Sequence, residues 1–180
     1  YNFDVTEKLE HLNFFTQKRG PDNTTTYKRD NHLFAHNLLS ITGDFTKQPF
    51  YDERCVVLFN GEIYNYKDFN PEAKSDGEII IPCFYKYGKS FFNKLDGEFA
   101  IVIYDYEEKE VLVATDTFST KPVWVGKSFE NNKYSICSYK SAIERSGISN
   151  CFKVPANSLL VFDIDSLNLK NKFKIKKFDL

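Results

Sequence analysis

The sequence predicts an α+β fold with at least two sheets, because many short strand-like segments alternate with a few short helices. The apolar run at 54–59 (RCVVLF) has the length of a strand and no polar alternation, which is typical of a strand buried on both faces. The segments 99–104 and 110–114 flank a turn-like DYEEK, and this pattern indicates a β-hairpin. By contrast, the apolar residues of 76–88 recur at helical spacing and predict a helix.

The other elements follow in chain order. Residues 6–17 suit a short helix that ends at Arg19-Gly20-Pro21-Asp22, and the polar stretch 22–31 is expected to be a loop. The predicted helix at 76–88 begins at Asp76 and ends at Gly88. The remaining expectations are an extended segment at 32–37, a second short helix at 89–95, strands near 122–125, 133–138 and 158–164, and a helical turn at 140–146.

Length and charge exclude several function classes. The 180 residues fit one domain, and 42% apolar residues exclude a disordered tail. The 24 basic and 25 acidic residues nearly cancel, so the net charge of −1 favours neither nucleic acid nor membrane as a partner. We find no apolar run long enough to span a bilayer, and the first residues do not resemble a signal peptide.

The four cysteines, Cys55, Cys83, Cys137 and Cys151, form no CxxC pair, and none has a histidine at metal-ligand spacing. We therefore expect buried free thiols and a cytoplasmic protein.

No metal site is expected either. His32 and His36 lie four apart, but on a strand this spacing spans about 13 Å, too far for one ion. We expect His36 to be a buried, hydrogen-bonded histidine. Gly-rich phosphate-binding loops are also missing from the sequence.

The most informative stretch is FNGEIYNY at 59–66. A buried strand runs directly into Asn60 and Gly61, whose side-chain amide and backbone N–H can converge on a developing oxyanion. The carboxylate of Glu62 follows at once. The alternative is a simple Asn-Gly hairpin turn, and this segment taken alone favours the turn.

Six further segments occur in a fixed order around FNGEIYNY: RGPD at 19–22, AHNLLSI at 35–41, Gln48-Pro49, SDGE at 75–78, LDGEFAIVIYD at 95–105 and DTFSTKP at 116–122. With these motifs the sequence resembles the class-II glutamine amidotransferase domain, most closely that of the asparagine synthetases. The resemblance runs from residue 1 to about 165, where Pro155 matches the proline before the last strands of the family.

The resemblance implies a four-layer αββα sandwich of two antiparallel sheets, the N-terminal-nucleophile fold. It also implies that an N-terminal cysteine attacks the side-chain amide of glutamine, with its own α-amine as the general base. By the same resemblance, Asn60 and Gly61 would form the oxyanion hole. Glu62 and Asp76 would hold the α-ammonium group of glutamine, and Ile41, Thr42 and Gly77 would line its pocket.

Two departures from the family bear on activity. The sequence has no N-terminal cysteine, and an internal cysteine offers no free α-amine, so the chain as written is expected not to hydrolyse glutamine. In addition, Leu38 stands where the family usually has an arginine that clamps the α-carboxylate of glutamine. Lys47 is a nearby candidate to replace that charge.

Three readings remain. In the first, the sequence begins a few residues late and the natural domain is a glutaminase, which the complete absence of methionine favours. In the second, the domain is a scaffold or ligand sensor that lost catalysis, as in β-lactam synthetase-like relatives, and Leu38 favours this reading. The third is an unrelated β-rich binding module.

The resemblance also fixes the expected domain organisation and partners. Residues 1–165 would form the amidotransferase-like domain without its first strand, and 166–180 a basic C-terminal strand or the start of a linker. The expected partners are glutamine and a synthetase domain in cis or in trans, with ATP and Mg²⁺ required only by that synthetase. Homodimers are common among such relatives, although the sequence shows no interface for one. Lys170, Lys172, Lys174 and Lys176 would form one side of a solvated edge strand.

Overall fold

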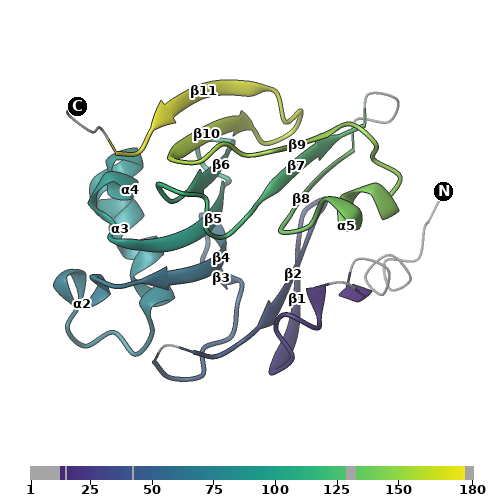
Figure 1. Ribbon diagram of the computed structural model, residues 1–180. Coiled ribbons are helices and arrows are strands. Elements are labelled where there is room, and N and C mark those ends of the chain that lie inside the picture. Colours follow the sequence, from purple (N-terminus) through teal and green to yellow (C-terminus); the bar gives the residue numbers. More distant parts are fainter. Residues whose placement is uncertain (1–12, 15, 42, 129–132, 177–180) are drawn as a thin grey trace.

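A six-stranded antiparallel sheet forms the centre of the computed structural model, which describes residues 13–14, 16–41, 43–128 and 133–176 (Figure 1). The order of its strands is β11-β10-β6-β5-β4-β3. In chain order these are β3 (Phe50–Tyr51), β4 (Cys55–Ile63), β5 (Gly97–Asp105), β6 (Glu110–Thr115), β10 (Ser158–Asp163) and β11 (Leu169–Lys174). The strands β5 and β6 form the expected hairpin, with Ala100 opposite Thr115 and Asp105 opposite Glu110.

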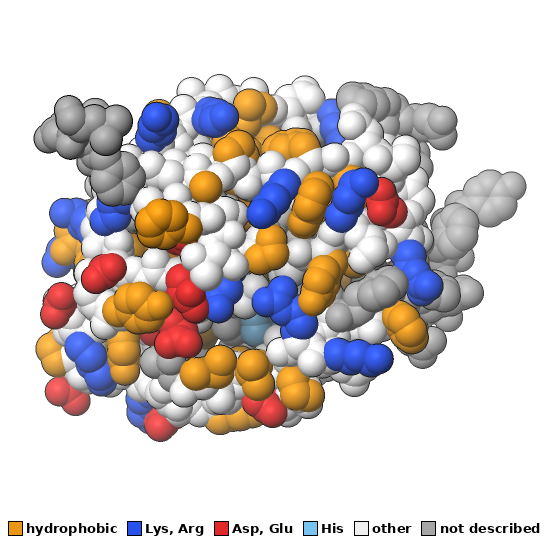
Figure 2. All heavy atoms as spheres, in the orientation of Figure 1, with side chains coloured by type: hydrophobic (Ala, Val, Ile, Leu, Met, Phe, Trp, Pro, Cys, Tyr) orange, Lys and Arg blue, Asp and Glu red, His pale blue; other side chains and the backbone are white. Residues whose placement is uncertain are grey.

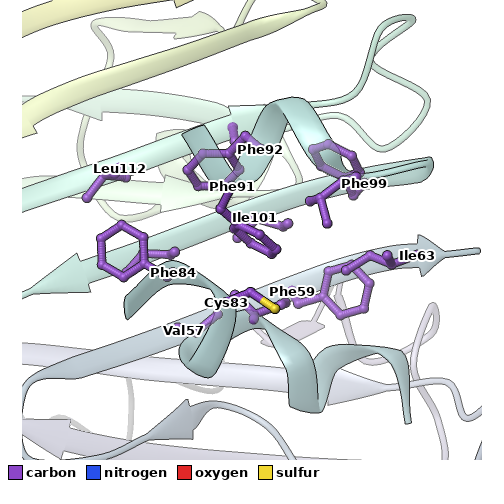
Figure 3. Packing of buried hydrophobic residues seen from close by; sticks show 14 of the residues in the cluster. Val57, Phe59, Ile63, Cys83, Phe84, Phe91, Phe92, Phe99, Ile101 and Leu112 are labelled. Atoms are coloured by element: carbon purple, nitrogen blue, oxygen red, sulfur yellow. The ribbon is translucent and has the colours of Figure 1, made fainter. Parts of the chain in front are cut away.

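A helical layer covers one face of this sheet. It contains the 3₁₀ turn η1 (Asp76–Ile79), α3 (Ile80–Tyr87), the 3₁₀ turn η2 (Gly88–Ser90) and α4 (Phe91–Lys94), so both helices expected between 76 and 95 are confirmed. A further short helix, α2 (Tyr66–Phe69), follows β4. Figure 3 shows Phe84 and Phe91 of this layer pointing onto Ile101 and Leu112 of the sheet. No described helix is long and apolar enough to cross a membrane.

The opposite face of the central sheet packs against a second β layer. This layer consists of two separate antiparallel sheets: the hairpin β1 (Asn23–Arg29) and β2 (His32–Leu38), and the sheet β8-β7-β9, with β7 (Trp124–Lys127), β8 (Tyr134–Cys137) and β9 (Cys151–Lys153). The helix α5 (Lys140–Arg145) contacts all three strands of the latter, and Gly126 of β7 leaves space for Ile143. The layers therefore follow the expected order αββα.

Two separate cores result, and β4 contributes to both. Its alternate residues Val57, Phe59 and Ile63 belong to the core beneath the helices. Val56 belongs to the core between the β layers, which also contains Ala100 of β5. Because successive side chains of a strand point to opposite faces, Asn60 and Glu62 lie on the side of Val56.

The prediction of a loop at 22–31 is wrong. Residues 22–31 are not a loop, because 23–29 form strand β1, which pairs along its whole length with β2. The segment contains three successive threonines, Thr24 to Thr26, whose branched Cβ atoms suit a strand. Asp30, with φ of 50°, turns the chain into β2. The helix expected at 6–17 lies mostly outside the described residues, of which 13, 14 and 16 are helical.

The chain's last described strand, β11, forms an edge of the central sheet and pairs with β10. All six of its residues are exposed. Lys170, Lys172 and Lys174 alternate along it, as the sequence indicates, and Lys176 follows just after the strand, where its Nζ donates to the carbonyl oxygen of Asn93 at 2.7 Å.

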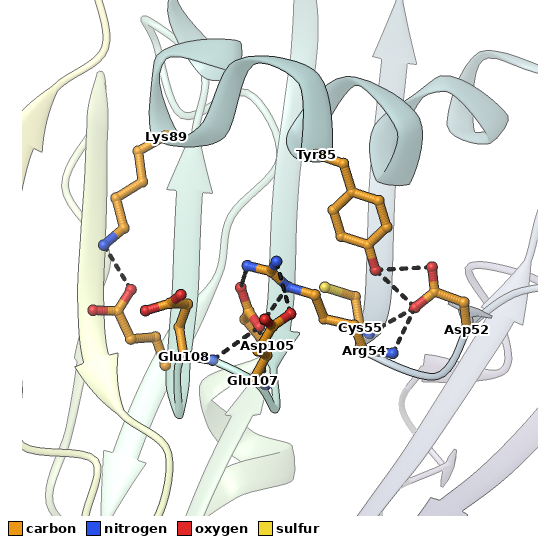
Figure 4. Close-up of polar contacts among 9 residues, drawn as sticks. Asp52, Arg54, Cys55, Tyr85, Lys89, Asp105, Glu107 and Glu108 are labelled. Carbon is orange, nitrogen blue, oxygen red and sulfur yellow. Dashed lines mark hydrogen bonds and ion pairs between the residues drawn. The ribbon is translucent and has the colours of Figure 1, made fainter.

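An ion-pair network lies where β4 begins and β5 ends, at the opposite end of these strands from Asn60 and Gly61 (Figure 4). Arg54 donates from Nε and Nη2 to the two carboxylate oxygens of Asp105, at 3.0 and 2.6 Å. It also pairs with Glu107 at 2.9 Å. The side chain of Asp105 is only 1% exposed, so the guanidinium is what neutralises a buried carboxylate. This contact raises the pKa of Arg54.

Replacing Arg54 with alanine is expected to lower the free energy of unfolding by about 1–3 kcal/mol, because the Asp105 carboxylate then stays buried without its partner. The value lies below that of a fully buried pair because the Arg54 side chain is 33% exposed to screening water. Urea denaturation measures the loss. Lys140→Ala is the control, since it removes only the exposed pair with Glu144 on α5. Equal losses in the two variants would contradict the prediction.

Candidate functional site

An open cleft with a volume of about 1670 Å³ lies between the central sheet and the second β layer. Figure 2 shows a hollow near the middle of this face, with a histidine at its floor, acidic side chains on one side and basic ones on the other. The described site residues expected from the sequence all line this cleft: Ile41, Asn60, Gly61, Glu62, Asp76 and Gly77. Thr42 lies outside the described residues. The cleft therefore brings together residues that are up to 36 positions apart, from 41 to 77.

Asn60 and Gly61 lie inside strand β4 and not in a hairpin turn. Asn60 is opposite Ala100, and Gly61 is opposite Phe99. The glycine is needed at this point for two reasons. Its φ is +147°, and a Cβ atom there would lie 2.0 Å from the carbonyl oxygen of Glu98. The turn interpretation of the Asn-Gly pair is thus wrong, and the strand delivers both residues to the cleft.

The hydrogen bonds of Phe99 reveal the direction of the Gly61 N–H. Phe99 donates its N–H to Oδ2 of Asp116, and its carbonyl oxygen accepts from the Asp116 N–H, both at 3.0 Å. The Phe99 backbone is therefore engaged on the β6 side, which makes Gly61 and Phe99 a non-hydrogen-bonded pair. The Gly61 N–H consequently points away from β5, toward the edge of β4 that borders the cleft.

Two carboxylates lie beside this N–H. Asp76 begins η1, and its Oδ2 accepts from the Ile63 N–H at 2.8 Å, which fixes the carboxylate against the end of β4. Burial raises the pKa of Asp76, and the charge of Glu62 adds to the rise, while backbone N–H donors oppose it. Gly77 follows Asp76. A Cβ atom at Gly77 would lie 2.5 Å from the ring of Phe50, so a side chain would collide there. The end of β4 therefore combines two negatively charged side chains with the Gly61 N–H, which points toward the cleft.

The RGPD motif supports the rim of the cleft by backbone contacts. Gly20 lies so close to β2 that a Cβ atom there would be 2.0 Å from the carbonyl oxygen of Asn37. Asp22 donates its N–H to Leu38 and accepts from the Ser40 N–H at 2.9 Å through Oδ2. These bonds fix the chain just before Ile41, whose side chain is 67% exposed at the rim.

The cations around the cleft differ from the sequence expectation. Lys47 is exposed and is not among the lining residues, whereas Lys121 is, and its Nζ lies 2.8 Å from Oε1 of Glu98. Glu98 is directly opposite Glu62 across β4 and β5. Lys121 therefore offsets the repulsion between two like charges that face each other. Leu38 lines the cleft as an apolar residue.

Sequence reasoning assigned no role in the site to Gln48, and it predicted His36 only as a buried, hydrogen-bonded histidine. The structure leaves His36 half-buried. The hydrogen bond is confirmed: Nε2 of His36 lies 3.1 Å from the carbonyl oxygen of Phe59. Oε1 of the buried Gln48 accepts from the Phe59 N–H at 2.9 Å. Both residues lie within the quoted motifs, but spacing along the chain does not reveal that they meet at one residue of β4.

All four cysteines are free thiols, as expected, but only Cys55 and Cys83 are buried, whereas Cys137 and Cys151 are half-buried. Cys55 and Cys83 lie in the core beneath the helices, while Cys137 lines the cleft. Burial raises the pKa of Cys137, so its thiol stays protonated and is a poor nucleophile at neutral pH. His32 bonds to the hydroxyl groups of Tyr106 and Tyr134, at 3.1 and 2.7 Å. No group of three or more potential metal ligands occurs among the described residues.

Comparison with known proteins identifies the family to which this chain belongs. A family model described as "Glutamine amidotransferase domain" matches residues 2–170. Similar curated proteins include asparagine synthetase B of Escherichia coli (strain K12), 29% identical over 151 residues, which are 78% of this chain and 27% of that protein. The asparagine synthetase of Zea mays is 34% identical over 136 residues, 68% of this chain and 22% of that protein. Both are described as glutamine-hydrolysing. The chain thus spans about a quarter of the length of these relatives.

Solved structures share the fold. The glutamine phosphoribosylpyrophosphate amidotransferase of B. subtilis aligns with a TM-score of 0.62 and 20% identity, covering 79% of this chain and 34% of that one. A glutamine aminotransferase class-II domain protein from Silicibacter pomeroyi aligns with a TM-score of 0.53 and 11% identity, covering 73% of this chain and 72% of that one. At this identity the likeness concerns the arrangement of the strands and helices.

Proposed function

This chain belongs to the family of glutamine amidotransferase domains and is of the asparagine synthetase type, and we propose on this premise that its cleft binds glutamine for hydrolysis to glutamate and ammonia. The observation that carries the proposal is the arrangement at the end of β4. There the Gly61 N–H points to the open edge, the Asn60 side chain faces the cleft, and Asp76 is fixed against Ile63.

The chemistry follows from these groups. The side-chain carbonyl oxygen of glutamine would accept from the Gly61 N–H and the Asn60 amide, which stabilise the negative charge that develops on attack. The α-ammonium group would lie against Glu62 and Asp76. The α-amine of the cysteine would take the thiol proton, and the thiolate sulfur would bond to the amide carbon. The C–N bond then breaks as the amine returns that proton to the departing nitrogen, so that ammonia leaves and a thioester remains. Water then hydrolyses the thioester to glutamate. The thiol is the N-terminal cysteine that the family resemblance implies, since none of the four cysteines in the sequence has a free α-amine.

The ammonia would be consumed by a synthetase partner. The support for this is the length of the relatives: the matched region is 27% of the Escherichia coli protein and 22% of the Zea mays protein. A synthetase that activates a carboxylate with ATP and Mg²⁺ requires an ammonia donor, and an amidotransferase domain supplies one. Aspartate is the default acceptor by analogy with these relatives.

Isothermal titration of the protein with L-glutamine tests the proposal. We expect saturable binding of L-glutamine and much weaker binding of D-glutamine, because inversion of the α-carbon keeps the α-ammonium group from reaching Glu62 and Asp76 while the side-chain carbonyl lies at Asn60 and Gly61. Ammonia release is then assayed with the natural full-length protein. If L-glutamine and D-glutamine bind equally, or neither binds, the cleft is not a glutamine site.

A second candidate, a scaffold or ligand sensor that does not hydrolyse glutamine, is favoured by Leu38. The resemblance implies an arginine there to hold the α-carboxylate, and an apolar side chain lines the cleft instead. Loss of one partner of a buried charge pair costs about 2–5 kcal/mol. The two functions differ in outcome: a scaffold or ligand sensor releases no ammonia from L-glutamine even as the full-length protein.

A further inference from the structure

The edge of β4 that borders the cleft is only partly covered by a neighbouring strand. The backbone groups of alternate strand residues point to the same edge, so Val57, Phe59, Gly61 and Ile63 share this one. The two-residue strand β3 reaches only Val56 and Val57. Ile63 is bonded by Asp76 at 2.8 Å. Between these points lie Phe59 and the proposed oxyanion donor, Gly61.

At Phe59, side chains bond to the backbone in place of a neighbouring strand. Its N–H donates to Oε1 of Gln48 at 2.9 Å, and its carbonyl oxygen lies 3.1 Å from Nε2 of His36. Both peptide groups that flank Phe59 are therefore fixed from outside the sheet. The second of them links Phe59 to Asn60, so the contact with His36 is one peptide away from the Asn60–Gly61 peptide.

The geometry also determines the tautomer of His36. A carbonyl oxygen can only accept, so Nε2 must carry a proton, and in the neutral ring Nδ1 then holds a lone pair. Nδ1 is buried and has no hydrogen-bond partner among the described residues. Burial lowers the pKa of His36, which agrees with a neutral ring.

We propose that His36 and Gln48 are positioning residues, which hold the backbone on either side of Phe59 so that the Asn60 amide and the Gly61 N–H stay aimed at one point in the cleft. The inference rests on the proposed function. An oxyanion site needs its donors placed within about 0.5 Å. A strand edge with free backbone groups at Phe59 would not provide that precision, whereas the half-buried His36 and the buried Gln48 do.

The first test uses the wild-type protein and needs no ligand. Nitrogen–proton correlation spectra of the histidine side chains report which ring nitrogen is protonated. We expect His36 to be neutral with the proton on Nε2 at pH 7. A proton on Nδ1 would overturn the proposal, because the ring could not then donate to Phe59.

The second test compares three variants. Glutamine at position 36 places an amide N–H near the location of Nε2, while the shorter asparagine does not reach Phe59. We expect His36→Asn to shift the backbone amide resonances of Asn60 and Gly61 and to weaken L-glutamine binding about fivefold to tenfold, the effect of one lost hydrogen bond. His36→Gln should stay within about twofold of the wild type. His32→Gln is the matched control, on the same strand but bonded to Tyr106 and Tyr134.

The outcomes separate this inference from the proposed function. Unchanged Asn60 and Gly61 resonances in His36→Asn, or equal shifts in His32→Gln, would refute positioning by His36. If the wild type does not bind L-glutamine, the proposed function fails, and the resonances still decide whether His36 holds β4. If His36→Asn does not fold, the tautomer of His36 in the wild type and the binding and resonances of His36→Gln decide whether His36 positions β4. Gln48→Met provides a parallel test, because it removes the acceptor for the Phe59 N–H at similar volume.

Discussion

Replacing Gly61 with alanine is expected to lower the free energy of unfolding by about 4 kcal/mol and to abolish glutamine binding. The added Cβ atom would meet the carbonyl oxygen of Glu98 at 2.0 Å, on a backbone with φ of +147°. Backbone strain of about 1–3 kcal/mol adds to a similar overpacking cost. The collision also pushes β4 away from β5 at the residue whose N–H points into the cleft. Thermal denaturation should show a melting temperature lower by roughly 8–16 °C.

Gly147→Ala is the control for the backbone alone. Gly147 has φ of +84°, but a Cβ atom there would meet nothing within 4 Å. It should cost about 1–2 kcal/mol and leave glutamine binding intact. If Gly61→Ala behaves like Gly147→Ala in both stability and binding, the close approach of β4 and β5 at Gly61 is not a requirement of the site.

Replacing Asp76 with asparagine is expected to weaken glutamine binding by roughly thirtyfold or more. Removal of one partner of a buried charge pair costs about 2 kcal/mol or more, and the proposed partner is the α-ammonium group of glutamine. The asparagine oxygen can still accept from the Ile63 N–H, which Asp76 bonds at 2.8 Å, so the end of β4 should keep its structure. Titration calorimetry measures the affinity, and Asp44→Asn, at the exposed rim of the same cleft, is the control.

The pH dependence gives an independent check on Asp76. Burial raises its folded pKa above the ordinary value of 3.8, so the carboxylate gains a proton at a higher pH than an exposed one. Only the ionised form attracts an ammonium group. Glutamine affinity should therefore be complete above the folded pKa and fall as the pH drops through it, while Asp76→Asn shows no such fall. A wild-type affinity that stays constant down to the ordinary aspartate range would exclude Asp76 from the ammonium site.

The sequence predicted the elements whose pattern is local. The run at 54–59 and the hairpin of 99–104 with 110–114 are apolar and regular, and both occur as strands. The sequence analysis did not predict strand β1, because its threonines are polar, although their branched shape suits a sheet. The division of the second β layer could not be predicted, since strand pairing depends on contacts between distant segments.

The site shows the same limit. Asn60, Gly61 and Glu62 are adjacent in the chain, so their motif is visible in the sequence, and the structure adds that they lie within a strand. The meeting of His36 and Gln48 at Phe59 joins segments 23 and 11 residues away from it. A hydrogen bond between a side chain and a distant backbone group leaves no periodic trace in a sequence.

Side chains alternate along β4, so the residues that stabilise the fold and those proposed to contact the ligand lie on opposite faces of one strand. Val57, Phe59 and Ile63 pack beneath the helices, while Asn60 and Glu62 face the cleft and contribute to neither apolar cluster. Substitutions on the cleft face can therefore accumulate without emptying the helix-side core, Gly61 being the exception because it is bound by backbone geometry. A lineage that no longer needed the reaction would keep a stable domain while its cleft diverged. Stability measurements alone would not distinguish such a descendant from an active enzyme.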